Sequence, residues 1–235
     1  MSIYRADMLF ETFLASPVPG PDLDPAIIVP DGGLPDQPSG IPAYNPPLDF
    51  RRAGTMALRA TIYKADLQIA DMDRHYYADH ALTLARHPSE TDERMMVRVL
   101  LYALAAEEGI AFTRGLSEVS EPEIWIKDLS GEIRLWIDLG QPDETRIRKA
   151  CSRADQVWVA CYGSGCEVWW RQIADKLGRH DNLTVMQISA ETSRELAGLA
   201  TRSMRLQCMV QDGEITLSSD EGSVAVQLTR LKQVA

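Results

Sequence analysis

Three acidic residues and one lysine in the middle of the chain have the residue types that phosphodiester hydrolysis requires. They are Glu93, Glu123, Asp138 and Lys149. Glu93 falls on the same predicted helix face as Met96, one turn after the helix start. An acid on that face would be removed from water. Glu123 follows Pro122 at the start of a predicted strand, and Asp138 lies near the end of the next strand. A carboxylate at the edge of a core costs free energy unless it is paired, protonated or bound to a cation.

The chemistry that this set could perform is metal-dependent hydrolysis. Three carboxylates can hold one or two Mg²⁺ ions, or Mn²⁺ as the alternative, by hard oxygen contacts. A bound metal lowers the pKa of its water and neutralises charge on the transferring phosphate. Lys149 would orient that water and stabilise the developing negative charge. The spacing therefore predicts catalytic residues Glu93, Glu123, Asp138 and Lys149, with the three acids as metal ligands.

The elements that would position these residues can be read from capping and turn signals. Ser89 is a good N-cap, and a helix from there would end at Glu108, with Gly109 as its stop. Two strands between residues 121 and 139 turn at Ser130-Gly131, and a helix opens at Pro142 or Asp143 and runs to about Ala154. The apolar stripe of the first helix would be Met96, Val97, Leu100, Ala103 and Leu104.

The rest of the chain alternates strands with helices. Alternating polarity predicts an antiparallel hairpin over residues 58–70 and 76–85, and continuous apolar runs predict buried strands at 156–162 and 183–188. Helices are expected at 166–177 and 191–201. A second hairpin over 204–234 would turn at Asp212-Gly213, with one more strand after Gly222. The pattern predicts an α/β fold with a mixed β-sheet flanked by helices.

The first 55 residues differ from everything that follows. Ten of the thirteen prolines lie there, and prolines remove backbone donors and interrupt both helices and central strands. The composition predicts a disordered leader. Because a clean strand pattern begins at Met56, we favour the interpretation that translation starts there, which leaves residues 56–235 as a single α/β domain.

Composition limits the class of protein. The formal charge of -10 argues against a domain that grips nucleic acid by bulk charge, although it allows a local basic patch. The four cysteines show no CxxC pair and are expected to be reduced thiols in the core, and the four histidines show no zinc-binding spacing. No apolar run is long enough to span a membrane, and the N-terminus has no secretory signal pattern. The expected class is a bacterial-type cytoplasmic protein.

Two further motifs have structural explanations. Gly163-Ser-Gly165 follows a strand and opens a helix, as a dinucleotide-binding loop does, but the third glycine is missing and no lysine follows. A strand-to-helix turn is therefore expected. The adjacent Trp169 and Trp170 are expected to line the core and a groove rather than stack on a ligand.

Four runs in the chain resemble the YaeQ family of small bacterial proteins. They are residues 56–64 (MALRATIYK), 82–96 (LTLARHPSETDERMM), 112–115 (FTRG) and 135–150 (LWIDLGQPDETRIRKA). The resemblance covers the chain from Met56 and implies a compact α/β fold with a variant PD-(D/E)XK nuclease-like core, in a family with no established activity. It matches Glu93 to the helix acid, Glu123 to the acid after proline, and Asp138 to the acid of the D/E-x-K element.

The chain departs from that pattern at the lysine. Gly140 stands where the lysine of the D/E-x-K element belongs, and glycine can neither polarise water nor contact a phosphate. Lys149, on the following helix, is the expected replacement, and Arg146 is the other candidate. Without a replacement, the site cannot hydrolyse a phosphodiester.

Two functions therefore stand as hypotheses. The first is a divalent-metal-dependent nuclease-like phosphodiesterase acting on nucleic acid. The alternative is a catalytically inactive module of the same fold that binds nucleic acid or a protein partner, with the acids as a structural hydrogen-bonding cluster. A rim of free cations around the cleft would favour nucleic acid. The candidates for that rim are Arg86, Arg94, Arg114, Arg146 and Lys149.

Overall fold

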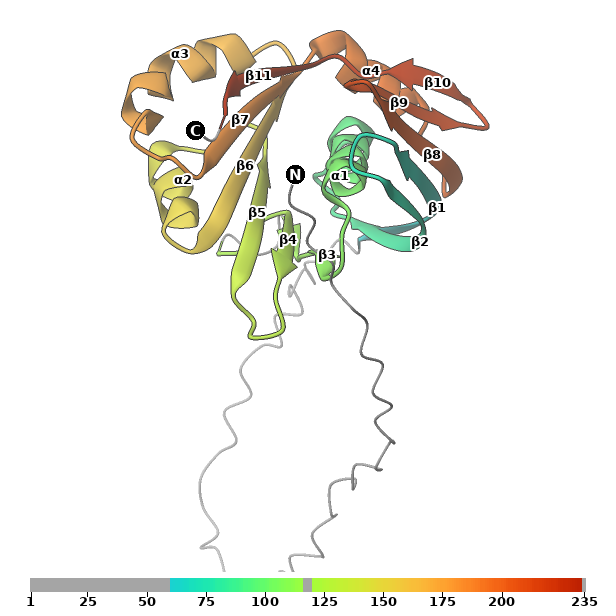
Figure 1. Cartoon of the computed structure of the whole chain (residues 1–235). Coiled ribbons are helices and arrows are strands. Elements are labelled where there is room, and N and C mark those ends of the chain that lie inside the picture. Colours follow the sequence, from blue (N-terminus) through green and yellow to red (C-terminus); the bar gives the residue numbers. More distant parts are fainter. Residues whose placement is uncertain (1–59, 116–119, 234–235) are drawn as a thin grey trace, which may run out of the picture. The chain divides into compact units, whose positions relative to one another are not determined.

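The strands form two mixed sheets rather than one. The structure is a computed structural model that describes residues 60–115 and 120–233, so the leader of residues 1–55 and Met56 lie outside the described residues. One sheet has five strands in the order β10-β9-β8-β1-β2, and the other has six in the order β11-β7-β6-β5-β4-β3 (Figure 1). The predicted α/β class is confirmed, whereas the expectation of one mixed sheet is wrong.

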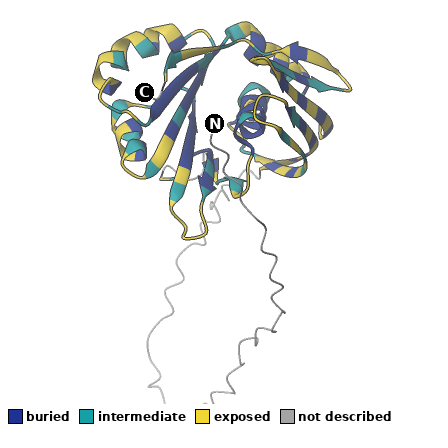
Figure 2. Ribbon diagram, in the orientation of Figure 1, coloured by how far each residue is buried: buried dark blue, intermediate teal, exposed yellow. Residues whose placement is uncertain are grey.

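The five-stranded sheet is made from the two ends of the domain. Its strands are β1 (Thr61–Asp71), β2 (Tyr76–Arg86), β8 (Ser203–Gln211), β9 (Glu214–Ser219) and β10 (Gly222–Ala225). β1 pairs antiparallel with β2 and parallel with β8, which joins the two predicted hairpins. Buried and exposed residues alternate along β1 and β8, as Figure 2 shows. Each of these strands therefore buries only one face, so the hairpins form their own sheet over a helix rather than extending the central sheet.

That helix is α1 (Asp92–Ala105), which is buried along most of its length. Its residues share one apolar core with the inner faces of both sheets and with α4 (Ala190–Gly198). The helix begins later than predicted, because the Thr91 hydroxyl accepts the Arg94 N–H at 3.1 Å while Ser89 instead contacts His87. It also ends before Glu108, and a short strand, β3 (Ile110–Phe112), follows that the sequence did not indicate.

The six-stranded sheet carries the stretch that holds Glu123 and Asp138. β4 (Ile124–Lys127) and β5 (Ile133–Leu139) are antiparallel and turn at Ser130-Gly131 as predicted. α2 (Glu144–Cys151) then crosses to β6 (Ala154–Tyr162), and α3 (Cys166–Leu177) crosses to β7 (Leu183–Ile188), so β5, β6 and β7 run parallel. Both helices pack against one face of this sheet around Trp136, Val157 and Val185.

The C-terminal end differs from prediction by one strand. After β10 the chain leaves the five-stranded sheet, and β11 (Leu228–Lys232) pairs antiparallel with β7 at the edge of the other sheet. The turn at Asp212-Gly213 is where it was expected, with both residues at positive φ.

Two smaller predictions, on the cysteines and on the glycine turn, are confirmed. All four cysteines are free thiols, and Cys161, Cys166 and Cys208 are buried. Gly163, with φ of 77°, and Gly165, the residue before α3, form a strand-to-helix turn. Among the helices in residues 60–115 and 120–233, none is both long enough and apolar enough to cross a membrane.

Candidate functional site

Asp138 and Arg146 form a two-point ion pair between β5 and α2. Arg146 Nε donates to Asp138 Oδ2 at 2.8 Å, and Arg146 Nη2 donates to Asp138 Oδ1 at 2.7 Å. The same Nη2 also donates to the Glu121 backbone carbonyl at 2.8 Å. Asp138 is only 1% exposed, so both of its oxygens have exchanged water for a guanidinium group.

Burial and ion pairing shift the pKa of each of these two groups in opposite directions. Burial raises the pKa of the Asp138 carboxyl, and the hydrogen bonds and charge of Arg146 only partly offset that rise, while the nearby charge of Glu123 adds to it. Burial disfavours the Arg146 cation, but its bonds to Asp138 and the surrounding acids outweigh that effect, and the pKa of Arg146 is raised. The pair therefore makes an otherwise unfavourable buried carboxylate tolerable.

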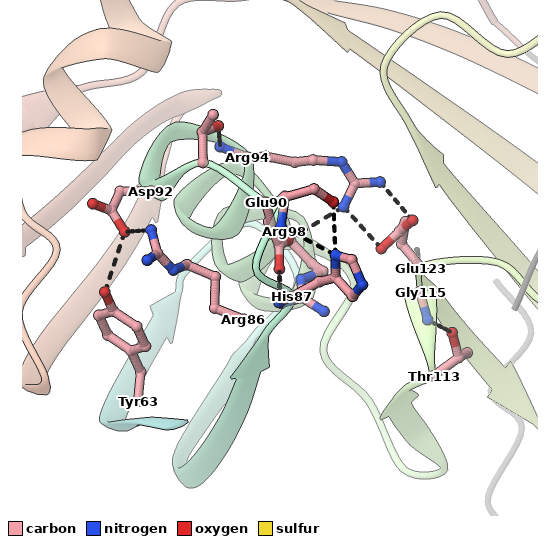
Figure 3. A network of polar contacts seen from close by, with 12 residues as sticks. Tyr63, Arg86, His87, Glu90, Asp92, Arg94, Arg98, Thr113, Gly115 and Glu123 are labelled. Atoms are coloured by element: carbon pink, nitrogen blue, oxygen red, sulfur yellow. Dashed lines mark hydrogen bonds and ion pairs between the residues drawn. The ribbon is translucent and has the colours of Figure 1, made fainter. Parts of the chain in front are cut away.

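Glu123 is held in the same way, by an arginine of α1. It directly precedes β4, and its backbone N–H donates to the Ile137 carbonyl at 2.9 Å, beside Asp138. Arg94 Nη2 donates to Glu123 Oε1 at 2.6 Å, and Arg94 Nη1 donates to Oε2 at 3.2 Å (Figure 3). Gly115, with φ of 51°, leaves room for this carboxylate, because a Cβ there would lie 2.7 Å from Glu123 Oε2. Glu123 is thus fixed from both sides.

Arg94 also belongs to a ladder of charges at the start of α1. Its Nη1 donates to Glu90 Oε1 at 3.2 Å, and Arg98 Nη2 donates to Glu90 Oε2 at 3.2 Å. Glu90 and Arg98 are both 5% exposed. Burial lowers the pKa of Arg98 despite the charge of Glu90, whereas for Arg94 the bonds and charge of Glu123 outweigh burial and raise the pKa. Figure 3 shows Arg94 reaching between Glu90 and Glu123.

Glu93, the helix acid, contacts a different element. It is half-buried, and its Oε1 accepts a hydrogen bond of 2.5 Å from the Ser193 hydroxyl of α4. Its charge, like those of Glu90 and Glu123, raises the pKa of the nearby Tyr162, which burial raises most. Glu93 therefore borders the same cluster, but in the part of the chain that the structure describes it forms no ion pair with Arg94 or Arg98.

Lys149 does not reach the acids. It is exposed on α2, and within residues 60–115 and 120–233 no hydrogen bond or ion pair joins its ammonium group to Glu93, Glu123 or Asp138. Arg146, one turn nearer the helix start, faces Asp138 instead. Gly140 has φ of 88° in the turn that leads from β5 toward α2, a conformation in which a lysine would be strained. The backbone thus explains why glycine stands at this position.

The three acids do not fit a metal ion as they are arranged. Carboxylate oxygens are suitable Mg²⁺ ligands. However, both oxygens of Glu123 and both of Asp138 accept from guanidinium groups, and Glu93 accepts from Ser193. In the described residues, no group of three or more His, Cys, Asp or Glu side chains is placed to hold a metal.

Comparison with known proteins identifies the family. The family model described as YaeQ protein matches residues 56–228. The chain belongs to the YaeQ family. The proteins named Uncharacterized protein YaeQ are 47% identical in Salmonella typhi and 46% identical in Escherichia coli (strain K12). Both matches span 179 residues, 76% of this chain and 99% of the relative.

Solved structures of the family agree with the fold. The YaeQ protein from Xanthomonas axonopodis pv. citri matches with a TM-score of 0.72 and 48% identity, over 74% of this chain and 98% of that one. The YaeQ protein from Pseudomonas syringae matches with a TM-score of 0.71 and 36% identity, over 74% and 97%. The resemblance to the YaeQ family is therefore confirmed, whereas the PD-(D/E)XK nuclease-like core that it implied stays a prediction.

Sequence reasoning missed the partners of the acids in this YaeQ-family chain. None of Glu90, Arg98 and Ser193 was singled out as a member of a site. One signal was available in the sequence. Glu90, Arg94 and Arg98 are spaced four residues apart, which places them on one side of a helix and of the residues just before it. Nothing in the sequence indicates the contact between Glu93 and Ser193, which are one hundred positions apart.

The expected basic rim is largely neutralised. Arg86 pairs with Asp92 at 2.7 Å, Arg94 pairs with Glu90 and Glu123, and Arg146 pairs with Asp138. In the described ranges, only the side chains of Arg114 and Lys149 lack an acidic partner among the five candidates. Little uncompensated positive charge is left around the acids.

Proposed function

We propose that this YaeQ-family protein is a non-hydrolytic binding module of nuclease-like architecture, and that its acids serve structure rather than metal binding. One observation carries the proposal: each buried carboxylate of the expected catalytic set has both oxygens on one arginine, Glu123 on Arg94 and Asp138 on Arg146. A bidentate arginine takes one lone pair on each oxygen and places a positive charge beside the carboxylate, which opposes the approach of a metal cation.

The position of the pairs supports a structural role. Arg94 connects α1 to the strand start at Glu123, and Arg146 connects α2 to β5 at Asp138. The first pair joins the helix inside the core to the six-stranded sheet. The second pair fixes a helix on the other face of that sheet. Buried charge pairs of this type specify how elements dock, because each charge is costly without its partner.

Charge favours a protein partner over nucleic acid. A phosphate backbone is bound by uncompensated Lys and Arg side chains. Three of the five rim candidates already pair with acids, and the whole chain carries a formal charge of -10. We therefore place this module among protein-binding members of its fold.

A metal-dependent phosphodiesterase is the second candidate, and one observation favours it. Glu123 and Asp138 lie at neighbouring strand ends, close enough for the charge of Glu123 to raise the pKa of Asp138. Such paired acids are common at catalytic centres. In this hypothesis Glu93, Glu123 and Asp138 bind Mg²⁺ or Mn²⁺, with Arg146 or Lys149 as the cation, and both arginine pairs must first open.

A cleavage assay separates the two candidates. The full chain is incubated with single- and double-stranded DNA and RNA, in Mg²⁺ or Mn²⁺, beside its Asp138→Ala variant as a control for contaminating nuclease. If the protein is a non-hydrolytic binding module, no cleavage should depend on Asp138. Cleavage by the wild type that the variant loses would overturn it.

Binding to labelled oligonucleotides tests the choice of partner class. Fluorescence anisotropy with increasing salt should give no affinity beyond weak, non-specific association, because little free positive charge faces the solvent near the acids. Tight binding with a steep salt dependence, reduced by Arg114→Gln and Lys149→Gln, would assign the module to nucleic acid instead.

A further inference from the structure

The space between the two sheets is hollowed away from the acid–arginine cluster, which consists of Glu90, Arg94, Arg98, Glu123, Asp138 and Arg146. A cavity of about 410 Å³ opens between the inner face of the six-stranded sheet and the end of the five-stranded sheet. A smaller cavity of about 230 Å³ adjoins it and shares Gln156 and Trp158 in its lining. Cavities that hold small organic molecules have volumes of roughly 300–1,000 Å³. The larger cavity is therefore the right size for such a molecule.

The wall of the larger cavity is mainly apolar. Its apolar side chains come from α1 and from both sheets, and they are Leu104, Trp158, Met186, Val210, Ile215 and Leu228. Trp158 is half-buried on β6, so part of its indole ring is open to the cavity. A flat apolar group could pack on this ring, with the Met186 thioether beside it.

One hydroxyl in this wall has no protein partner among the described residues. Thr184 lies on β7 directly beside Trp158 in the parallel register, and it shares the cavity-lining face with Met186. The residue is only 8% exposed, and its hydroxyl, which is not fully shielded from solvent, makes no hydrogen bond to any residue in 60–115 or 120–233. A cavity-lining hydroxyl without a protein partner can exchange its water for a polar atom of a bound ligand.

The mouth of the cavity carries one uncompensated cation. Arg230 on β11 is exposed, lies opposite Met186 in the strand register, and has no acidic partner in the described part of the chain. The other charged side chains there already have hydrogen-bond partners, although the negative charge of Asp73 is not paired with a cation in the described residues. Arg74 pairs with Asp71 at 2.6 Å, and Asp73 accepts the backbone N–H groups of the β8–β9 turn. Arg230 is thus the group available to an anion.

We propose that this cavity binds a small organic acid. Its aromatic or apolar body packs on Trp158 and Met186, its carboxylate pairs with Arg230, and a polar atom of the ligand hydrogen-bonds to the Thr184 hydroxyl. The site uses no residue of the acid–arginine cluster, so it does not depend on whether that cluster is structural or catalytic.

Binding of 2-naphthoate to the full chain tests the proposal, with 2-naphthalenemethanol as the neutral probe of the same shape. Isothermal titration calorimetry should show saturable binding of the acid. Arg230→Gln should weaken it about tenfold, as expected for a lost ionic hydrogen bond. Thr184→Val, which keeps the shape and removes the hydroxyl, should weaken it about threefold to tenfold. Arg171→Gln, an exposed arginine on α3, is the matched control and should bind as the wild type does.

Three results would overturn the proposal. They are the absence of saturable binding, equal binding of acid and alcohol, and affinities that neither Arg230→Gln nor Thr184→Val changes. Arg230 is exposed, so its Gln variant should fold whatever the effect of the Thr184 substitution. Quenching of tryptophan fluorescence by 2-naphthoate, lost in Trp158→Leu, gives a second readout, and quenching that persists in that variant would place the ligand elsewhere.

Discussion

Arg146 holds both carboxylate oxygens of Asp138, at 2.8 and 2.7 Å, from a position one turn into α2. This contact connects the two features that stood out in the sequence, an acid on a buried strand and a missing lysine. The basic group near Asp138 is an arginine, and its fork geometry matches a carboxylate at two points. The pair explains how the acid is tolerated in the core.

Removing Arg146 should leave the buried Asp138 carboxylate without its partner. Arg146→Met is expected to lower the free energy of unfolding by about 3 kcal/mol at neutral pH, because it leaves the buried Asp138 carboxylate without its partner. Lys149→Met, on the same helix but exposed, should change it by less than about 0.5 kcal/mol. Urea unfolding followed by circular dichroism compares the two. Equal losses would show that the pair carries no special stability.

Removing the Asp138 carboxylate should lower the free energy of unfolding less than removing Arg146 does, and the loss should depend on pH. Asp138→Asn deletes the charge that burial disfavours, while Arg146 is 25% exposed in its side chain and keeps access to water, so a loss of about 1 kcal/mol is expected. The pKa of Asp138 is higher in the folded protein than in the unfolded chain. Its contribution to the free energy of unfolding is therefore largest below the unfolded pKa and declines as pH rises through the folded pKa.

The stability difference between wild type and Asp138→Asn should therefore shrink as pH rises through that window. Chemical unfolding at a series of pH values measures it. A difference that grows with pH would mean that Arg146 holds the pKa of Asp138 below its ordinary value, opposite to the direction given above.

Removing Arg94 should lower the free energy of unfolding more than removing an arginine from an exposed ion pair. Arg94→Met leaves Glu123 with neither oxygen paired and removes one of two arginines from Glu90, so about 3–4 kcal/mol should be lost. Arg86→Met breaks a pair with Asp92, in which the two side chains are 25% and 45% exposed, and should cost about 1 kcal/mol or less. Thermal and urea unfolding of both variants test this ranking, and a reversed order would refute it.

Restoring the lysine of the D/E-x-K element should not create an enzyme. Gly140 has φ of 88°, so Gly140→Lys is expected to cost about 1–2 kcal/mol in backbone strain. Gly140→Asn should cost less, since asparagine adopts positive φ more readily. The Lys variant should still cleave no DNA or RNA, because Arg146 and Arg94 continue to occupy the acids. Metal-dependent cleavage by this variant would contradict that expectation.

The sequence predicted the elements that carry the site better than the contacts within it. The strand acids, the turn at Ser130-Gly131 and the helix after Pro142 were found because turn residues, caps and apolar periods are local signals. The second sheet was missed because β1 and β8 pair across more than a hundred residues, and strand alternation does not say which sheet a strand joins.

The pairing of the acids was also beyond local signals. Whether Asp138 faces Arg146 or Lys149 depends on how α2 is rotated over the sheet, which the burial of Ile147 and Ala150 decides. The partner of Glu123 lies on α1, and its approach depends on the packing of that helix between two sheets. Tertiary packing, rather than spacing, therefore determined which cation met which acid.

Titration of Mn²⁺ into the full chain by isothermal calorimetry tests the central claim most directly. If Arg94 and Arg146 hold Glu123 and Asp138 and neutralise their charge, the wild type and a Glu123→Gln, Asp138→Asn double variant should give the same heats, with no saturable site in either. Saturable Mn²⁺ binding by the wild type that the double variant loses would contradict the account and assign these acids to a metal.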